Sequence, residues 1–348
     1  MNAQSKPSIL GLSRKELQKA MGQTLLQPYQ AGQIMAWTYQ RGVVDFAGMT
    51  DLPAPLRSRL AGRFAITALE VARTAESADG TTKLLLRAAD GQSFECVLIP
   101  GRGRLTACLS SQAGCRLGCA FCATGDMEFG RNLSPADIVE QLIHLSRAAC
   151  GRRITNVVFM GMGEPLDNYE HVLPAARLIN SPDAFGLGAR HITISTAGLV
   201  PGIERLAAEP EQFKLAVSLN AADDATRDRL MPVNRKYSLA ELIASVKHYA
   251  ARTGKLVTFE YVLLAGTNDR KVDAGNLGRL LKGLPSKVNL IPFNGGGEAG
   301  FRPPSPAAVR EFHRLLSRLH PKVTVRASKG QDIAAACGML KAATVGRR

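Results

Sequence analysis

Three closely spaced cysteines are the residues of this chain best suited to do chemistry. They lie in Cys115-Arg-Leu-Gly-Cys119-Ala-Phe-Cys122, separated by three and then two residues, with a further glycine at position 114. Thiolates placed in this way can converge on one inorganic centre, because the glycines let the backbone fold tightly around it. A closed site takes four protein ligands, so three cysteines indicate a [4Fe–4S] cluster with one iron open to a non-protein ligand. The alternative is a zinc half-site or a set of unreactive thiols.

Further polar residues recur where predicted apolar strands end. Strands are predicted near residues 105–110, 154–161, 191–197, 213–220, 256–264 and 287–293. The cysteine stretch follows the first strand, and the polar residues that follow later strands are Gly161-Met-Gly163-Glu164-Pro165, Ser195-Thr196, Ser218-Leu219-Asn220 and Asn294. In a barrel of parallel strands the chemistry collects at the carboxyl ends of the strands. We therefore expect these residues to surround one site.

Two other interpretations compete with a ligand-binding role for the segment around Gly163 and Glu164. It could be the glycine-rich turn of a Rossmann-type methyltransferase, but it lacks a complete G-x-G-x-x-G and Pro165 follows at once. It could also be an ordinary glycine-rich turn with a solvated carboxylate.

Helices follow most of the predicted strands, and capping signals mark where they begin. Ser134-Pro135-Ala136-Asp137 and Ser238-Leu-Ala-Glu241 each supply a cap with a carboxylate at the third helical position, and Ser305-Pro306 opens another helix. Six βα units in series predict an α/β fold, a parallel sheet curled into a partial (βα)6 barrel. We assign residues 104–348 to this barrel, with a C-terminal strand and helix that carry Cys337.

Two smaller units precede the barrel. Residues 1–66 are predicted to form a helical accessory domain, in which Ser13 and Glu16 form a capping box and further helices cover Pro28–Tyr39 and Pro55–Phe64. It is either a structural cap or an RNA-docking unit. Residues 67–103 contain two Asp-Gly pairs, at 79–80 and 90–91, between β-rich runs, which predicts a β-hairpin extension.

Three single residues are further candidates. Glu95 stands alone in an apolar strand, where a glutamate is usually solvated, but burial at an active site would suit it to proton abstraction. Cys108 lies seven residues before the cysteine stretch, and Cys337 stands among alanines near the C-terminus. A lone cysteine among alanines is usually a small buried apolar residue, yet small neighbours also leave room for a bulky substrate.

Composition limits the class of protein and its partners. The 348 residues are 45% hydrophobic and carry a net charge of +15, of which residues 101–348 carry +12. A solvated basic surface is one explanation, and nucleic-acid binding is the other. The first residues lack the apolar region of a signal peptide, and no run is long enough to span a bilayer. With seven cysteines, these features predict a cytoplasmic protein.

The assembled motifs resemble the RlmN/Cfr family of radical S-adenosylmethionine (radical SAM) RNA methyltransferases. The C-x3-C-x2-C spacing, with Phe121 before the third cysteine, resembles the radical SAM signature, and the resemblance extends over nearly the whole chain. It implies one [4Fe–4S] cluster held by Cys115, Cys119 and Cys122, and two S-adenosylmethionine molecules consumed per methylation. The implied S-adenosylmethionine contacts are Gly163, Glu164, Ser195, Ser218, Leu219, Asn220 and Asn294. Asn220 replaces a histidine common in relatives, so a contact survives there but not a proton-transfer role.

The resemblance also implies a mechanism. Carbon 2 of adenine is not nucleophilic, so its methylation requires a radical route. Cys337 would first become S-methylcysteine, and after hydrogen abstraction its methylene carbon would join carbon 2. Glu95 would then accept the carbon 2 proton, and Cys108 would attack the Cys337 sulfur, leaving a transient Cys108–Cys337 disulfide.

The implied substrates are an adenosine of 23S ribosomal RNA in the peptidyl transferase centre and the adenosine next to the anticodon of transfer RNA. A flavodoxin-like electron donor, a monomer and no membrane partner are expected. A Cfr-like enzyme that methylates adenine carbon 8 is the nearest alternative. A radical SAM enzyme acting on a protein or small molecule and a non-catalytic zinc module that binds nucleic acid are alternatives from other classes.

Overall fold

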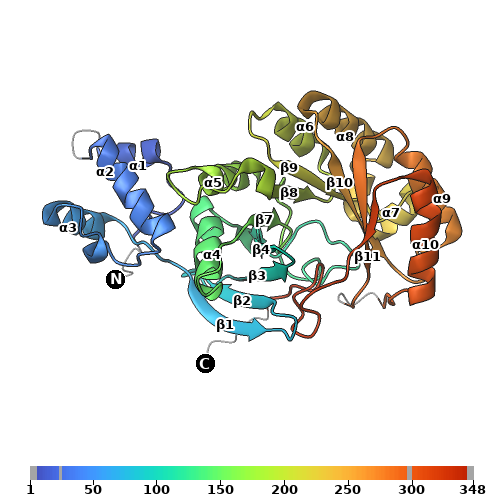
Figure 1. Cartoon of the computed structure of the whole chain (residues 1–348), viewed down its shortest axis with the longest axis horizontal. Helices are drawn as coiled ribbons and strands as arrows, with labels where there is room; N and C mark the ends of the chain where they lie inside the picture. The colour runs from blue at the N-terminus through green and yellow to red at the C-terminus, as the bar shows by residue number, and fades with distance from the viewer. Residues whose placement is uncertain (1–5, 23–25, 296–299, 343–348) are drawn as a thin grey trace.

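One long sheet organises the molecule in the computed structural model, which describes residues 6–22, 26–295 and 300–342 (Figure 1). Within these residues ten strands form one sheet in the order β1-β2-β3-β4-β7-β8-β9-β10-β11-β12. The strands are β1 (Glu70–Glu76), β2 (Thr82–Arg87), β3 (Ser93–Gly101), β4 (Arg104–Cys108), β7 (Asn156–Phe159), β8 (Ile192–Thr196), β9 (Lys214–Ser218), β10 (Val257–Leu263), β11 (Ser286–Pro292) and β12 (Val323–Val325).

Strand direction divides the sheet into two parts. Strands β1 to β4 are antiparallel neighbours joined by tight turns, whereas β4 and β7 to β12 run parallel to one another. The six predicted strands are β4 and β7 to β11, so the predicted partial barrel is confirmed. The two Asp-Gly turns join β1 to β2 and β2 to β3, so the predicted hairpins extend the edge of the barrel sheet.

Helices between the parallel strands cover the outside of the barrel (Figure 1). They are α4 (Pro135–Ala148), α5 (Tyr169–Asn180), α6 (Val200–Ala208), α7 (Asp224–Leu230), α8 (Leu239–Thr253), α9 (Lys271–Leu280) and α10 (Pro306–Leu319). The capping boxes predicted for α4 and α8 both form, which satisfies otherwise unpaired N–H groups at each helix start. Apolar side chains of the strands and helices form one continuous core.

The N-terminal unit lies at one end of the molecule (Figure 1). It contains α1 (Arg14–Met21), α2 (Pro28–Met35), a π-helical turn (Ala36–Gln40), a 3-10 turn (Phe46–Gly48) and α3 (Ala54–Arg63). These elements surround a small apolar core of their own. Glu140 of α4 ties the following linker to the barrel by accepting bonds from the N–H groups of Ala68 and Leu69, both at 2.9 Å. The domain boundaries at residues 66 and 103 stay predictions.

The C-terminal stretch differs from its prediction. The predicted strand is present as β12, but turns rather than a helix carry Cys337. Gly330, Ala334 and Gly338 all have positive φ, of 65°, 51° and 81°, and a right-handed helix cannot pass through such residues. No helix in the described part of the chain is both long and apolar enough to cross a membrane.

Candidate active site

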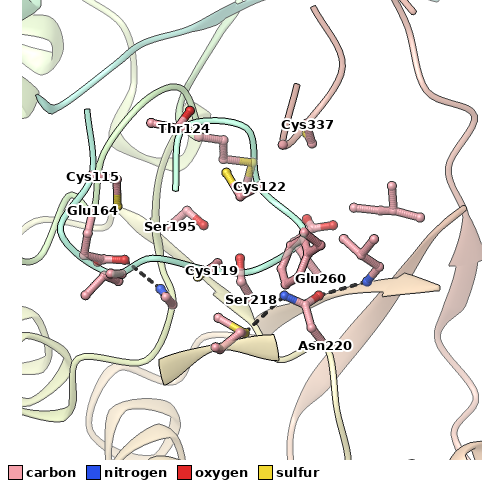
Figure 2. Close-up of a pocket in the computed structure, with 18 of the residues that line it drawn as sticks. Cys115, Cys119, Cys122, Thr124, Glu164, Ser195, Ser218, Asn220, Glu260 and Cys337 are labelled. Atoms are coloured by element: carbon pink, nitrogen blue, oxygen red, sulfur yellow. Dashed lines mark hydrogen bonds between the residues drawn. The ribbon is translucent and has the colours of Figure 1, made fainter. Parts of the chain in front are cut away.

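An open pocket of about 1050 Å³ lies at the carboxyl ends of the parallel strands (Figure 2). Ten of the predicted site residues line it: Cys115, Cys119, Cys122, Gly163, Glu164, Ser195, Ser218, Asn220, Asn294 and Cys337. Residues from six separate segments of the chain therefore meet in one place. The remaining three predicted residues, Leu219, Cys108 and Glu95, lie outside its lining.

The loop that carries the three cysteines has its shape fixed by backbone contacts. Gly114 has φ +83°, and a Cβ there would lie 2.4 Å from the Glu128 carbonyl oxygen, so only glycine fits. The Cys122 N–H donates to the Cys119 carbonyl at 3.0 Å, and the Ala120 N–H donates to the Leu230 carbonyl at 3.0 Å. The loop is thus held in a tight turn against Leu230, the last residue of α7.

The donor set fits an iron–sulfur cluster better than a single metal ion. Within the described residues, no group of three or more His, Cys, Asp or Glu side chains lies close enough to hold one ion. A tetrahedral zinc ion would bring its sulfurs to roughly 3.8 Å from one another, whereas each thiolate of a cluster binds a different iron and lies farther away. Burial raises the pKa of Cys115 to about 12 and also raises that of Cys119, and metal coordination would remove these protons.

Glu164 is buried at the floor of the pocket, which argues against a solvated turn carboxylate. Its Oε2 accepts from the Ala197 N–H at 2.7 Å (Figure 2). Its Oε1 accepts from the Leu166 N–H at 3.0 Å. Burial raises the pKa of Glu164 to about 7 despite these hydrogen bonds. The preceding Gly163 has φ +95°, and a Cβ there would lie 2.5 Å from the Gln112 side chain. The glycine therefore lets this loop pack against Gln112, in the short strand β5 (Gln112–Ala113) that precedes the cysteine loop.

Both polar atoms of the Asn220 side chain contact other residues of the chain. Its Oδ1 accepts from the Val262 N–H at 2.9 Å, and its Nδ2 points at the sulfur of Met231 at 3.3 Å (Figure 2). Its φ of 57° is left-handed, a conformation that asparagine tolerates better than most residues. Leu219 beside it has its side chain in the barrel core, so only its backbone could meet a ligand. Asn294 bonds Ser328 and accepts from Gln331 at 2.9 Å, which links it to the stretch before Cys337.

Two buried charged residues at this site were missed by the sequence analysis. Arg227 is fully buried and donates to three carbonyl oxygens at the ends of β8 and β9, those of Ala197, Ser218 and Leu219, at 2.5, 3.3 and 3.0 Å. Burial lowers the pKa of Arg227 to about 10. In sequence it resembles any solvated arginine of a polar helix, so no signal marked it. It fixes the strand ends from which Ser218 and Asn220 project.

Glu260 is the second residue that was missed. It is a buried carboxylate in the middle of β10 that lines the pocket, and its Oε1 accepts from Asn289 at 2.9 Å. Its Oε2 has no hydrogen-bond partner among the described residues, and burial raises the pKa of Glu260. The sequence could have indicated Glu260, because it is a single carboxylate in an apolar strand, and the same feature identified Glu95 as a candidate.

Cys108 and Cys337 lie together, although they are 229 residues apart in sequence. Both line a second cavity of about 550 Å³ next to the first, and Cys337 borders both cavities. Burial, with Cys337 nearby, raises the pKa of Cys108 to about 12. The stretch beside Cys337 is tied to the cysteine loop, since the Ala123 N–H donates to the Gly338 carbonyl at 2.8 Å and Thr124 donates to the Leu340 carbonyl at 2.7 Å.

Glu95 lies in a third cavity, of about 880 Å³, on the other side of the Cys337 stretch. The expectation that a strand glutamate is solvated was wrong, because Glu95 is buried and forms an ion pair with Lys83 at 2.9 Å. Its Oε2 accepts from the Lys341 N–H at 3.1 Å. The structure therefore does not bring Glu95 into the pocket that holds the three cysteines.

Comparison with known proteins matches both the N-terminal unit and the barrel. Residues 109–274 match the radical SAM superfamily, and residues 8–66 match the ribosomal RNA large subunit methyltransferase N-terminal domain. A probable dual-specificity RNA methyltransferase RlmN of Gemmatimonas aurantiaca is 50% identical over 92% of this chain and 88% of that protein. The dual-specificity RNA methyltransferase RlmN of Anaeromyxobacter dehalogenans is 46% identical over 97% and 92%. A crystal structure of a radical SAM methyltransferase from Sphaerobacter thermophilus is similar with a TM-score of 0.94, at 45% identity over 97% of this chain and 100% of that one.

Proposed function

Because the chain belongs to the RlmN family of radical SAM RNA methyltransferases, we propose that it methylates carbon 2 of adenosine in two RNAs. These are 23S ribosomal RNA, at the peptidyl transferase centre, and transfer RNA, at the position next to the anticodon. The observation that supports the proposal most is the place of Cys337, which borders both the pocket of the three cysteines and the cavity of Cys108.

Cys115, Cys119 and Cys122 would hold the [4Fe–4S] cluster at one end of the pocket. S-adenosylmethionine would lie beside it, in contact with Gly163, Glu164, Ser195, Ser218, Asn220, Asn294 and the backbone of Leu219. When bound, the two groups together supply a radical able to abstract hydrogen, and two S-adenosylmethionine molecules are consumed per methylation. Arg227 keeps the carboxyl ends of β8 and β9 in register for these contacts.

Cys337 is the methyl carrier in this proposal. Its sulfur first takes a methyl group from one S-adenosylmethionine, and this methyl group then loses a hydrogen atom. The resulting methylene carbon bonds to carbon 2 of adenine, which joins protein and RNA covalently, and the adduct gives up the carbon 2 proton and one electron, which the cluster would take up. Cys108 attacks the Cys337 sulfur, and the carbon freed from that sulfur takes up a proton as the methylated RNA is released. The product is a Cys108–Cys337 disulfide, which an external reductant returns to two thiols with two electrons and two protons.

Glu95 accepts the proton that leaves carbon 2. In this structure the carboxylate is held by Lys83 and the Lys341 N–H, on the far side of the Cys337 stretch. The proton transfer therefore requires that stretch to shift, so that the adenine can contact Cys337 and Glu95 together.

The partners follow from the same proposal. The net charge of +15 suits an RNA substrate, whose target base must be unstacked to reach the Cys337 thiol. A flavodoxin-like protein would supply the electron, the enzyme would act as a monomer, and a cytoplasmic location stays a prediction. The alternative is methylation of adenine carbon 8, as in Cfr-like enzymes.

The test is a nucleoside analysis. Cluster-loaded protein is incubated anaerobically with transcribed 23S ribosomal RNA or transfer RNA, a reductant and methyl-labelled S-adenosylmethionine, and the RNA is digested and analysed by mass spectrometry. Labelled 2-methyladenosine from both RNAs is the expected product. Labelled 8-methyladenosine would favour the alternative. Cleavage of S-adenosylmethionine without any labelled nucleoside would instead favour a protein or small-molecule substrate.

A further inference from the structure

The stretch that carries Cys337 has little structure of its own. We call residues 326–341 the thiol segment; it follows β12 and contains turns but no helix or strand. Ordering such a stretch costs conformational entropy that its own backbone hydrogen bonds do not offset. The contacts that hold it must therefore come from other parts of the chain.

Those contacts come in large part from the turn that joins β1 to β2. Asp332 accepts from the Ser77 hydroxyl at 2.6 Å and from the Ala78 N–H at 3.2 Å. In the opposite direction, Asp79 Oδ2 accepts from the Gly330 N–H at 3.0 Å, while its Oδ1 closes the turn by accepting from the Thr81 N–H at 2.9 Å. The Asp332 carboxylate of the thiol segment thus bonds the β1–β2 turn, and the Asp79 carboxylate of the turn bonds the thiol segment.

A second row of contacts continues along the neighbouring strands. Lys83 of β2 donates to the Ala334 carbonyl at 3.2 Å and forms the ion pair with Glu95 of β3. Glu95 in turn accepts from the Lys341 N–H. Hydrogen bonds from the β1–β2 turn, β2 and β3 therefore reach the thiol segment on both sides of Cys337 in sequence.

We propose that the β1–β2 turn is a dock for the thiol segment, and that Asp79 and Asp332 are positioning residues that place the Cys337 sulfur between the two cavities. The proposal rests on the proposed function for the meaning of Cys337, but the docking itself is independent of any RNA or cofactor. Loss of the dock leaves the cysteine loop and the barrel intact, and lets the thiol segment sample positions in which Cys337 is away from Cys108.

Asp79→Asn is the sharpest perturbation, because the chain offers a matched control. Asp79 and Asp90 each precede a glycine in a hairpin turn, and each closes its turn by accepting a backbone N–H with Oδ1, at 2.9 and 3.0 Å. The second oxygen of Asp79 bonds the thiol segment, whereas that of Asp90 bonds Arg131. Asparagine keeps one acceptor oxygen, so Asp79→Asn retains the turn and loses the bond from Gly330, whereas Asp90→Asn retains its turn and leaves the dock unchanged.

Hydrogen–deuterium exchange of the cluster-loaded protein measures the dock directly. Asp79→Asn is expected to speed exchange within residues 326–341 by about three- to tenfold, the size expected for loss of a charged, partly exposed hydrogen bond, and to leave the barrel strands unchanged. Asp90→Asn is expected to leave exchange in residues 326–341 at the wild-type rate. Equal exchange of the thiol segment in the two variants would overturn the proposal.

Thiol–disulfide equilibrium with glutathione tests positioning rather than stability alone. Oxidised glutathione takes two electrons and two protons from Cys108 and Cys337, giving their disulfide and two reduced glutathione molecules, and peptide mass spectrometry after alkylation measures the ratio. Asp332→Ala and Ser77→Ala are each expected to lower this equilibrium constant about three- to tenfold, and the double variant to lower it no further than Asp332→Ala alone. Independent, multiplying effects would contradict a shared contact.

The two proposals fail differently. If Cys337 of the wild-type enzyme is never found S-methylated, the proposed function fails, and exchange in residues 326–341 still decides the dock. If Cys337 is S-methylated to the same extent in wild type, Asp79→Asn and Asp332→Ala, and the exchange rates also agree, the dock fails and the methyl-carrier role stands.

Discussion

The ion pair between Lys83 and Glu95 gives the prediction with the most clearly defined size. Replacing Lys83 by methionine keeps the length of the side chain but leaves the Glu95 carboxylate buried, with the Lys341 N–H as its one remaining partner among the described residues. Breaking a buried ion pair by removing one partner costs about 3–5 kcal/mol. The Lys83 side chain retains 14% exposure and that of Glu95 6%, so water screens the pair in part. We therefore expect Lys83→Met to lower the free energy of unfolding by about 3 kcal/mol.

A double-mutant cycle isolates the pair. Glu95→Gln removes the charge but keeps an acceptor for the Lys341 N–H, so we expect it to cost about 2 kcal/mol. The double variant replaces both charges by neutral groups and is expected to cost about 3 kcal/mol, less than the sum, which gives a coupling free energy of about 2 kcal/mol. Urea unfolding followed by far-UV circular dichroism measures all four proteins.

The neighbouring β1–β2 hairpin supplies the control for this cycle. Arg87 and Glu70 pair at 3.8 Å on β2 and β1, but their side chains are 34% and 67% exposed. Because such pairs contribute little, we expect a coupling free energy below about 1 kcal/mol for Arg87→Met with Glu70→Gln. Strictly additive costs for Lys83→Met and Glu95→Gln would refute the argument that Lys83 keeps a buried charge at Glu95.

Three further predictions concern the pocket. Gly163→Ala should lower the free energy of unfolding, measured in urea, by at least about 1 kcal/mol more than Gly151→Ala does. Both glycines have positive φ, but of the two only a Cβ at 163 would meet atoms within 4 Å. Equal losses of stability would contradict this. Cys108→Ala should accumulate a covalent RNA–protein adduct on denaturing gels, and free protein after turnover would remove Cys108 from the mechanism. Cys119→Ala should lose bound iron and sulfide, whereas the exposed Cys150→Ala should retain both; iron retained by Cys119→Ala would contradict the ligand assignment.

The strands of the barrel could be predicted because each is an apolar run that ends at a glycine or polar residue. β12 was assigned only as part of a C-terminal strand and helix, since its three residues, Val323 to Val325, are partly or well exposed and carry little pattern. The turns around Cys337 depend on a positive φ at Ala334, and an alanine in the sequence does not predict this conformation. Local sequence alone therefore gives this stretch no distinctive signal.

The candidate site could be predicted where residue type and strand position agreed. The cysteine spacing and the polar strand ends placed ten residues in one pocket. Arg227 could not be found in this way, because its burial results from packing under β8 and β9 and not from its helical neighbours. The sequence also gave no sign that Lys83, on the adjacent strand, would hold Glu95 away from the pocket.

One isotope measurement tests the central claim, that Cys337 carries the methyl group and delivers it as a methylene. The enzyme, first loaded with a deuterated methyl group on Cys337 from trideuteromethyl S-adenosylmethionine, is allowed to methylate ribosomal RNA, and the 2-methyladenosine is analysed by mass spectrometry. Because one deuterium is abstracted before the carbon–carbon bond forms, the account predicts a product methyl group with two deuterium atoms. A product that retains all three would mean direct transfer of an intact methyl group and would contradict it.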